Sequence, residues 1–283
     1  MNLFIGSSSI GVFKLFKNFN YKVIKVRGGT AKGLYTNQNG NEIIQTITNI
    51  KKPINAILLH FGEVDINFSY YYKVCNSIDK NINYKEFCND IYNEYIKFID
   101  KIVAISKCKN IIIEGLYPNP VKDNLKIDQL LNYGIIDNKD CLLEETLNRK
   151  FQETLRKFYN NLLHKFCIYK NKINKEHKYN NTNYFYYDLD KYIFNNGKID
   201  KKFIDLSIVN VHLRWEPLVP YHIKILHKIC GLSKDNLIDI KKVEDQYLKY
   251  KINKLKKKSL MKRIKQTKKY KVSKKNIPSN NFF

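Results

Sequence analysis

The segment Leu3-Phe4-Ile5-Gly6-Ser7-Ser8-Ser9-Ile10-Gly11 guides the interpretation of the whole chain. Three apolar residues lead directly into Gly6, three hydroxyl residues follow, and apolar residues then recur through Phe16. This order predicts a buried strand, a tight turn and the start of a helix. Such a turn brings serine hydroxyls close to free backbone N–H groups, where a serine is either a nucleophile or an ordinary N-cap.

The composition indicates a folded domain followed by a basic segment. Of the 283 residues 43% are hydrophobic, which is enough for a substantial core. The formal net charge is +25, and the segment Lys249–Lys275 alone holds 14 Lys or Arg residues and no acid. Such a block is a solvated charged segment or a non-specific contact for nucleic acid or another anionic surface. We expect one domain over residues 1–232, and a charged helix with a flexible basic tail over residues 233–283.

The cysteines and the N-terminus show no motif for metal binding, secretion or membrane insertion. The six cysteines form no CxxC pair and no Cys/His cluster at zinc spacing, so we expect reduced core residues, no metal and no cofactor. They are Cys75, Cys88, Cys108, Cys141, Cys167 and Cys230. Because neither a signal-peptide pattern nor a run of 18 apolar residues is present, we predict a cytoplasmic chain without a membrane span.

Apolar runs typical of strands alternate with helical periodicity along the chain. The predicted strands are Leu3–Ile5, Tyr21–Val26, Ile54–Phe61, Asn110–Leu116 and Tyr184–Leu189. We predict helices over the region from Tyr70 to about Lys107, over Leu143–Tyr169 and over Tyr221–Ile229. Residues 121–138 lack a clear period, so we expect them to form an excursion over one end of the sheet, and the polar residues 170–183 are expected to form a loop. The alternation predicts an α/β fold, a three-layer α/β/α sandwich with a central parallel sheet of about five strands in a flavodoxin-like arrangement.

Glycine and polar residues follow these strands where a parallel sheet would gather them at one edge. Gly28 and Gly29 follow the second strand, Gly62-Glu63-Val64-Asp65 follows the third, and His212 comes after the fifth. A serine-type hydrolytic site needs a nucleophile, a base within hydrogen-bond reach and N–H donors for the developing oxyanion. Ser8 and His212 suit the first two roles, although an isolated histidine is more often a surface or core residue.

Four short blocks, in order, resemble those of the SGNH (GDSL) hydrolase superfamily. They are Gly6-Ser7-Ser8, Gly28-Gly29-Thr30-Ala31, Gly62-Glu63-Val64-Asp65 and His212-Leu213. The chain is most similar to a branch with Gly-Glu-(Ile/Val)-Asp in the third block, over roughly residues 2–230. The resemblance implies the SGNH hydrolase fold, Ser8 as nucleophile and His212 as base. It also implies oxyanion donors at the backbone N–H of Ser8 and Gly28, with Gly29 as the fallback.

The chain departs from the family pattern at three positions. Ser7 stands where the family has aspartate, and Val64 stands where the family has an asparagine side chain that donates to the oxyanion. Val209 occupies the position of the aspartate three residues before the catalytic histidine. Asp205 is then the candidate to orient His212, or a Ser–His dyad uses a backbone carbonyl instead.

Three polar residues remain as candidates for substrate binding. They are Glu63, Asp65 and Arg214, and Asp65 is alternatively a structural anchor. Basic and aromatic residues are expected at the rim of the cleft, where aromatic faces would stack on sugar rings. They are Arg27, Lys32, Tyr70, Tyr71, Tyr72, Arg214 and Trp215.

Two hypotheses for function follow from the sequence. The first is a serine hydrolase acting on an ester, with an O-acetylated glycan as one candidate substrate, and the sequence does not separate hydrolysis from acyl transfer. The second is a catalytically decayed SGNH-like domain that acts as a binding module, with Lys249–Lys275 contacting nucleic acid or an anionic surface.

Overall fold

The first strand, β1 (Asn2–Gly6), is buried along its whole length and pairs in parallel with a strand on each side. The structure, a computed structural model, describes residues 1–17, 19–78, 82–177, 181–205 and 212–239, together with 241, 245, 249, 252 and 253. The sheet has five strands in the order β2-β1-β3-β4-β5, and every pairing in it is parallel. This confirms the predicted parallel sheet and its flavodoxin-like strand order.

The remaining elements follow the predicted alternation of strand and helix. The other strands of the sheet are β2 (Tyr21–Lys25), β3 (Ala56–His60), β4 (Asn110–Glu114) and β5 (Asn183–Tyr187), and a small hairpin joins β6 (Phe194–Asn195) to β7 (Lys198–Ile199). The α-helices are α1 (Gln38–Thr48), α2 (Tyr70–Asn76), α3 (Tyr84–Ser106), α4 (Lys126–Asn132), α5 (Glu144–Leu147), α6 (Arg149–His177), α7 (Asp190–Ile193) and α8 (Val219–Cys230). The 3₁₀-helices are η1 (Ser8–Leu15), η3 (Asp123–Leu125), η4 (Lys201–Phe203), η5 (Glu216–Leu218) and η6 (Lys234–Asn236), and η2 (Asp65–Ser69) is a π-helix.

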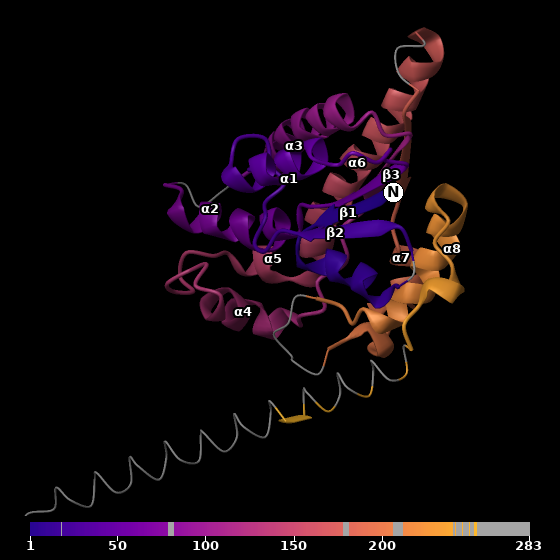
Figure 1. Cartoon of the computed structure of the whole chain (residues 1–283). Coiled ribbons are helices and arrows are strands. Elements are labelled where there is room, and N and C mark those ends of the chain that lie inside the picture. The colour runs from indigo at the N-terminus through magenta and orange to yellow at the C-terminus, as the bar shows by residue number, and fades with distance from the viewer. Residues whose placement is uncertain are drawn as a thin grey trace, which may run out of the picture. The chain divides into compact units, whose positions relative to one another are not determined.

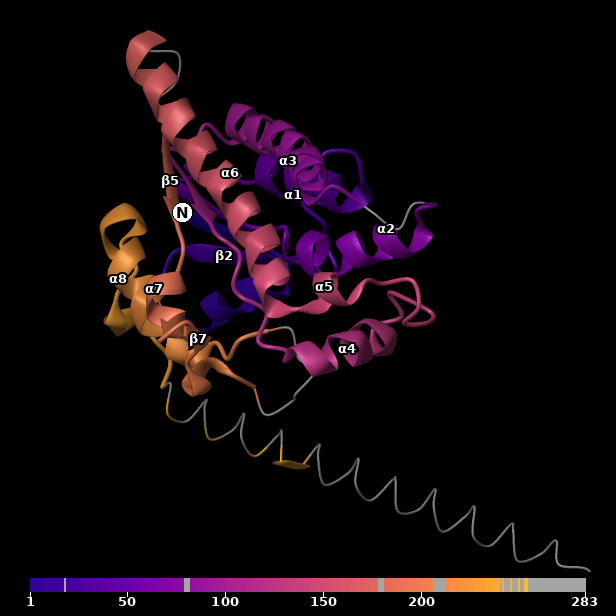
Figure 2. The same ribbon diagram turned by 180° about the vertical axis from the view of Figure 1, so that it is seen from behind.

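Helices cover both faces of the sheet, which makes the three predicted layers (Figures 1 and 2). Successive side chains of a strand point to opposite faces. Leu3 and Ile5 accordingly pack into the core beneath α1, α3 and α6. Phe4 instead stacks on Phe13 of η1, which in turn contacts His222 of α8. The fold class predicted from the sequence is therefore confirmed.

Helix α6 extends eight residues beyond Tyr169, so the prediction of a polar loop over residues 170–183 is wrong for residues 170–177. The last turns of the helix carry asparagines that pair with the edge strand β5. Asn171 exchanges two hydrogen bonds with the backbone of Tyr184, and the Asn174 amide donates to the carbonyl of Thr182. Side-chain pairing with an exposed strand edge explains why a polar sequence is helical here.

The segment 121–138, predicted as an excursion over one end of the sheet, contains η3 and α4. The prediction that all six cysteines are reduced is wrong. Cys75 and Cys141 form a disulfide across 66 residues of sequence, whereas the other four cysteines are free and buried. No local pattern connects two cysteines so far apart, so this pair could not be predicted from the sequence.

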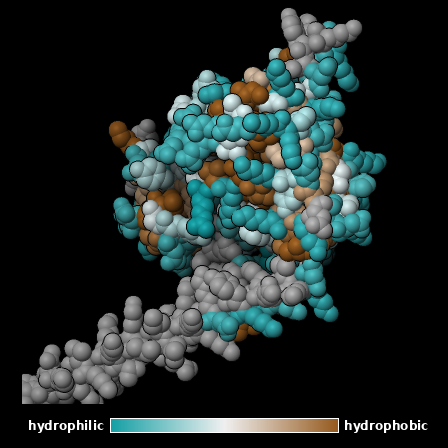
Figure 3. Space-filling view, viewed as in Figure 1, coloured by the Kyte–Doolittle hydropathy of each residue, from teal (hydrophilic) through white to brown (hydrophobic). Residues whose placement is uncertain are grey.

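The chain divides into two units, Met1–Leu237 and Ile238–Phe283. Most of the segment Lys249–Lys275 lies outside the described residues, so its role stays a prediction. Over the face shown in Figure 3, hydrophilic side chains dominate and apolar ones gather in separate patches. None of the described helices has the length and apolarity needed to cross a bilayer.

Candidate active site

The candidate site lies at the carboxyl ends of β1 and β3, which are neighbours in the sheet. From β1 the chain crosses to β2 on one side, and from β3 it crosses to β4 on the other, so the strand order reverses between them. Open parallel sheets bind ligands at such a point. The two strands approach closely here, because a side chain at Gly6 would lie 2.6 Å from the carbonyl oxygen of His60.

The structure brings Ser8 and His212 together across 204 residues of sequence. Ser8 is the first residue of η1, and its Oγ lies 2.8 Å from Nε2 of His212. The two side chains face a cavity of about 270 Å³. Its wall is made by Ser8, Gly28, Glu63, Val64, Asn67, Phe68, Tyr133, Ile135 and His212. A hydroxyl hydrogen-bonded to an imidazole beside a cavity can deliver a nucleophile to a bound carbonyl.

Gly28 and Gly29 differ in how their backbones are used. Gly28 borders the cavity with a φ of +64°, a conformation that glycine adopts at little cost. The N–H of Gly29 is donated to the carbonyl of Val26 at 3.4 Å. Asp65 holds the loop that follows, because its carboxylate accepts the N–H groups of Ala31 and Lys32 at 2.7 and 3.4 Å. Of the two glycines, Gly28 is therefore the one at the cavity.

The Glu63 carboxylate accepts hydrogen bonds from the hydroxyls of the two residues that flank Ser8. Its Oε2 accepts a hydrogen bond from Ser7 Oγ at 2.9 Å, and Ser9 Oγ donates to both of its oxygens, at 2.8 and 2.6 Å. Ser9 Oγ also lies 3.4 Å from Nδ1 of His212. The carboxylate thus fixes the turn from which Ser8 projects, and it is connected through Ser9 to the far side of the imidazole.

A fully buried histidine lies between Glu63 and a second carboxylate. His60 Nε2 is 3.3 Å from Glu63 Oε1, and its Nδ1 is 3.3 Å from Glu114 Oε2. Burial by itself disfavours the imidazolium, but the two carboxylates outweigh it and raise the pKa of His60 to about 10. Burial would likewise raise the pKa of Glu63, but His60 first and His212 second lower that pKa to about 2. Glu63 is therefore a carboxylate, held by a cation, at neutral pH.

His212 is kept neutral at the same pH. Burial lowers the pKa of His212 below its ordinary value of 6.5, Lys25 and His60 lower it further, and Glu63 and Asp205 act in the opposite direction. Asp205 is buried, and its effect on the His212 charge is smaller than that of Glu63. A neutral imidazole can accept the serine proton, which a general base must do.

Several predicted site residues do not line the cavity beside Ser8. Asp65 is buried and occupied with the backbone of Ala31 and Lys32, which corresponds to the structural anchor and not to substrate binding. Arg214 is partly buried, with its Nε 3.8 Å from Glu216 Oε2. The predicted aromatic rim is wrong at Tyr70 and Tyr71, because both rings are buried in the core. Tyr70 packs against Phe87 of α3, and Tyr71 Oη donates to the carbonyl of Thr146 in α5.

Four residues of the cavity wall were not identified from the sequence. They are Asn67, Phe68, Tyr133 and Ile135. Asn67 lies one helical turn beyond Val64, so the helical continuation after the third block was the signal that could have found it. Tyr133 and Ile135 lie in the connection after α4, which has no periodicity to reveal which residues point inward.

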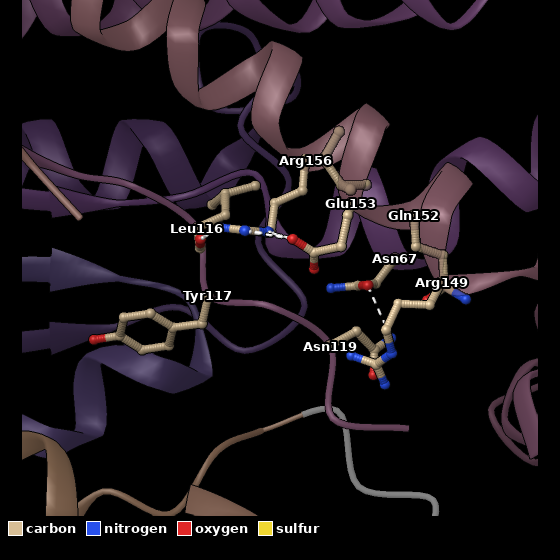
Figure 4. A pocket seen from close by; sticks show the side chains of 9 residues that line it. Asn67, Leu116, Tyr117, Asn119, Arg149, Gln152, Glu153 and Arg156 are labelled. Carbon is tan, nitrogen blue, oxygen red and sulfur yellow. Dashed lines mark hydrogen bonds and ion pairs between the residues drawn. The ribbon is translucent and has the colours of Figure 1, made fainter. Parts of the chain in front are cut away.

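The hydrogen bonds of Asn119 orient the amide of Asn67. The N–H of Val121 donates to Asn119 Oδ1 at 3.0 Å, so the Asn119 nitrogen is the atom that donates to Asn67 Oδ1, at 2.9 Å (Figure 4). The Asn67 nitrogen is therefore turned away from Asn119. An amide donor on the cavity wall, three residues after the valine, is a candidate for the side-chain donor that Val64 cannot supply.

Comparisons with known proteins give structural matches alone. No family model matches the sequence, and no curated protein matches it. One similar solved structure is a protein from Bacteroides ovatus described as a GDSL-like lipase, with 12% identity, coverage of 82% of this chain and 54% of that chain, and a TM-score of 0.42. Another is an extracellular lipase from Streptomyces rimosus, with 11% identity, coverage of 81% and 98%, and a TM-score of 0.44. The chain thus spans about half the length of the Bacteroides protein.

Proposed function

We propose that this chain is a serine ester hydrolase of the SGNH type, with Ser8 as nucleophile and His212 as general base. The observation that carries the proposal is the 2.8 Å contact between Ser8 Oγ and His212 Nε2 at the wall of a cavity. The lowered pKa of His212 supports it, because the base must be neutral to accept a proton. The order of the four blocks in the sequence supports it independently.

The reaction takes place in two halves. Ser8 Oγ attacks the acyl carbon while its proton moves to His212 Nε2, and His212 then gives that proton to the departing alcohol oxygen as the ester C–O bond breaks. A water molecule next adds to the acyl carbon, loses a proton to His212, and releases the acid as the Ser8 bond breaks and the proton returns to Oγ. Neither half needs a metal or an organic cofactor.

Negative charge on the substrate oxygen is held by hydrogen-bond donors beside Ser8. We assign this role to the backbone N–H groups of Ser8 and Gly28 and to the side-chain amide of Asn67. The Asn67 amide would take the place of the family's asparagine donor, whose position is occupied by Val64 in this chain. Gly28 is preferred to Gly29, since the Gly29 N–H is directed to Val26. Loss of one such donor costs on the order of a hundredfold in rate, so a replacement for the missing asparagine matters.

The cavity favours an ester with a short acyl group. Its volume of about 270 Å³ lies just below the range of roughly 300–1,000 Å³ that is usual for small-molecule sites. Phe68, Ile135 and Val64 give it apolar walls, which suit an acetyl or butyryl chain. An O-acetylated glycan fits this restriction on the acyl side, and the alcohol side would extend out of the cavity.

Hydrolysis of p-nitrophenyl esters of increasing chain length tests the proposal. We expect the acetate and butyrate to be hydrolysed well above the buffer rate and the decanoate poorly, with all activity lost in Ser8→Ala. Ser7→Ala is the matched control, because the neighbouring hydroxyl that it removes donates to Glu63. Equal rates for wild type and Ser8→Ala would reject the proposal.

A further inference from the structure

The structure links the proposed base to a buried carboxylate that comes from a different part of the chain than the family pattern implies. We propose that Glu63, acting through the hydroxyl of Ser9, is the positioning residue that orients His212 and fixes its tautomer. The contacts that carry this inference are the hydrogen bonds from Ser9 Oγ to Glu63 and the 3.4 Å approach of Ser9 Oγ to His212 Nδ1. The inference rests on the proposed function for its catalytic meaning.

The single hydrogen of the Ser9 hydroxyl determines which atom donates in the contact between Ser9 and His212. A serine hydroxyl has one hydrogen, and that of Ser9 is donated to the Glu63 carboxylate, which can only accept. Towards His212 the Ser9 oxygen can then only accept, so Nδ1 carries the proton. The neutral ring therefore presents the lone pair of Nε2 to Ser8, which is the tautomer a general base requires.

The charge on Glu63 is secured by the groups behind it. His60 and Glu114 are both buried, and with Glu63 they form an alternating row of carboxylate, imidazolium and carboxylate. Tyr117 Oη donates to Glu114 at 2.5 Å, so the far end of the row is also satisfied. A buried carboxylate is stable only when it is paired in this way, and the row keeps Glu63 ionised next to the site.

Asp205 is the competing candidate, because it lies seven residues before His212. Among the charged groups with the largest effects on the His212 charge are Glu63, Lys25, His60 and Asp205. Of the two carboxylates, Glu63 has the larger effect, and the Ser9 hydroxyl links it to Nδ1 of the ring. We therefore expect Glu63 to contribute more than Asp205, and parallel variants test that order.

Nitrogen NMR of the histidine rings tests the link without any need for activity. In wild type at neutral pH we expect His212 to be neutral with its proton on Nδ1. Ser9→Ala should shift the ring toward a mixture of both tautomers, whereas Ser7→Ala, which removes another hydrogen bond to Glu63 and keeps the Ser9 hydroxyl, should leave it unchanged. An unchanged tautomer in Ser9→Ala, or an equal change in both variants, would overturn the inference.

The kinetic constants and pH profiles of the variants distinguish a positioning role of Ser9 and Glu63 from a merely structural one. We expect Ser9→Ala to lower kcat by about 10- to 100-fold with little change in KM, as for loss of a hydrogen bond connected to a charged group. Glu63→Gln removes the charge that favours the imidazolium, so the acid limb of its pH profile should move down by about one unit. Asp205→Asn should move the limb less. A larger effect for Asp205→Asn on both kcat and the limb would reject the ranking.

The two proposals fail in different ways. If wild type neither hydrolyses esters nor reacts with an active-site serine probe, the proposed function is wrong, and the NMR comparison still decides whether Glu63 orients His212. If Glu63→Gln does not fold, Ser9→Ala retains both the charge and the buried row and supplies the decisive comparison. Activity with an unchanged His212 tautomer in Ser9→Ala would keep the proposed function and reject the role of Glu63.

Discussion

In the described part of the chain, two clusters with a buried charged residue at their centre lie near the same edge of the sheet, and only the first of them adjoins a cavity that can hold a substrate. The Glu63 cluster consists of Ser7, Ser9, His60, Glu63 and Glu114. The Arg156 cluster consists of Glu153, Arg156 and Asp190, and Arg156 also donates to the carbonyl of Leu116. Figure 4 shows Arg156 with Glu153 and Leu116.

The difference lies in what each cluster adjoins. The cavity beside the Arg156 cluster measures about 10 Å³, room for about one water molecule. Its guanidinium is matched by two carboxylates and a carbonyl, so it serves to join α6 to the chain after β4 and to α7. The Glu63 cluster instead reaches Ser8 and His212 and a cavity of about 270 Å³. Buried charge therefore indicates a site only where it meets a nucleophile and open volume.

The largest effect is expected from the base next to the Glu63 cluster. His212→Ala should lower kcat/KM for p-nitrophenyl acetate by about a thousandfold, because Ser8 loses its proton acceptor. His164→Ala is the matched control, since this exposed histidine on α6 stacks on Tyr186, far along the chain from the site. Comparable activity in the two variants would show that the imidazole has no catalytic role.

The Arg156 cluster should affect stability and not turnover. Arg156→Ala leaves two carboxylates without their cation, and because both carboxylates are partly exposed, the loss should be about 1–3 kcal/mol of the free energy of unfolding, below the cost for a fully buried pair. Urea denaturation measures that loss, and kcat of the folded variant should equal that of wild type. A selective loss of kcat with normal stability would remove the distinction between the two clusters.

Asp65 makes a useful contrast, because it lies two residues from Glu63 but the nearby charge of Lys32 has only a small effect on its pKa. Burial raises the pKa of Asp65 to about 6, and the backbone N–H groups of Ala31 and Lys32 only partly offset this. The folded state then binds a proton more tightly than the unfolded chain, so the contribution of Asp65 to stability is present at low pH and is lost as pH rises through about 6.

Unfolding experiments at several pH values measure this contribution against a neutral analogue. Relative to Asp65→Asn, wild type should gain about 2–3 kcal/mol in the free energy of unfolding as pH falls from 7 to 4. The reverse trend, with wild type gaining on the variant as pH rises, would mean that Asp65 is stabilised as a carboxylate, as Glu63 is.

The smallest effect is expected at the apolar wall of the cavity. Ile135→Ala should enlarge the space beside Ser8 and shift the preferred p-nitrophenyl ester toward longer acyl chains by a few-fold, with little change on the acetate. Leu131→Ala, at an exposed position on α4, is the control. An identical chain-length profile in wild type and Ile135→Ala would place the acyl group elsewhere.

The sequence was sufficient for the features that depend on local pattern. The run Leu3–Ile5 and the apolar stretch before Gly62 predicted buried parallel strands, and parallel strands bring their carboxyl ends to one edge, which is why Ser8 and His212 could be expected to meet. The end of α8 could also be predicted, because a glycine commonly ends a helix in the left-handed conformation. Gly231 does so here, with a φ of +75°.

Features that depend on contacts between distant segments were out of reach. The two hydroxyls beside Ser8 predict a turn or an N-cap, and nothing in the sequence indicates that Glu63 would bind both of them. The pairing of Cys75 with Cys141 depends in the same way on how the connection before α5 folds back toward α2. Disulfides persist in oxidising compartments, whereas the sequence predicts a cytoplasmic location. Titration of the free thiols in the native protein measures whether Cys75 and Cys141 are paired.

Reaction with a fluorophosphonate probe, followed by mass mapping of the modified peptide, shows directly whether Ser8 is the nucleophile. We expect one adduct on Ser8 in wild type, none in Ser8→Ala, and labelling that slows strongly in His212→Ala. An adduct on another residue, or equal labelling of wild type and Ser8→Ala, would contradict the role of Ser8 as nucleophile.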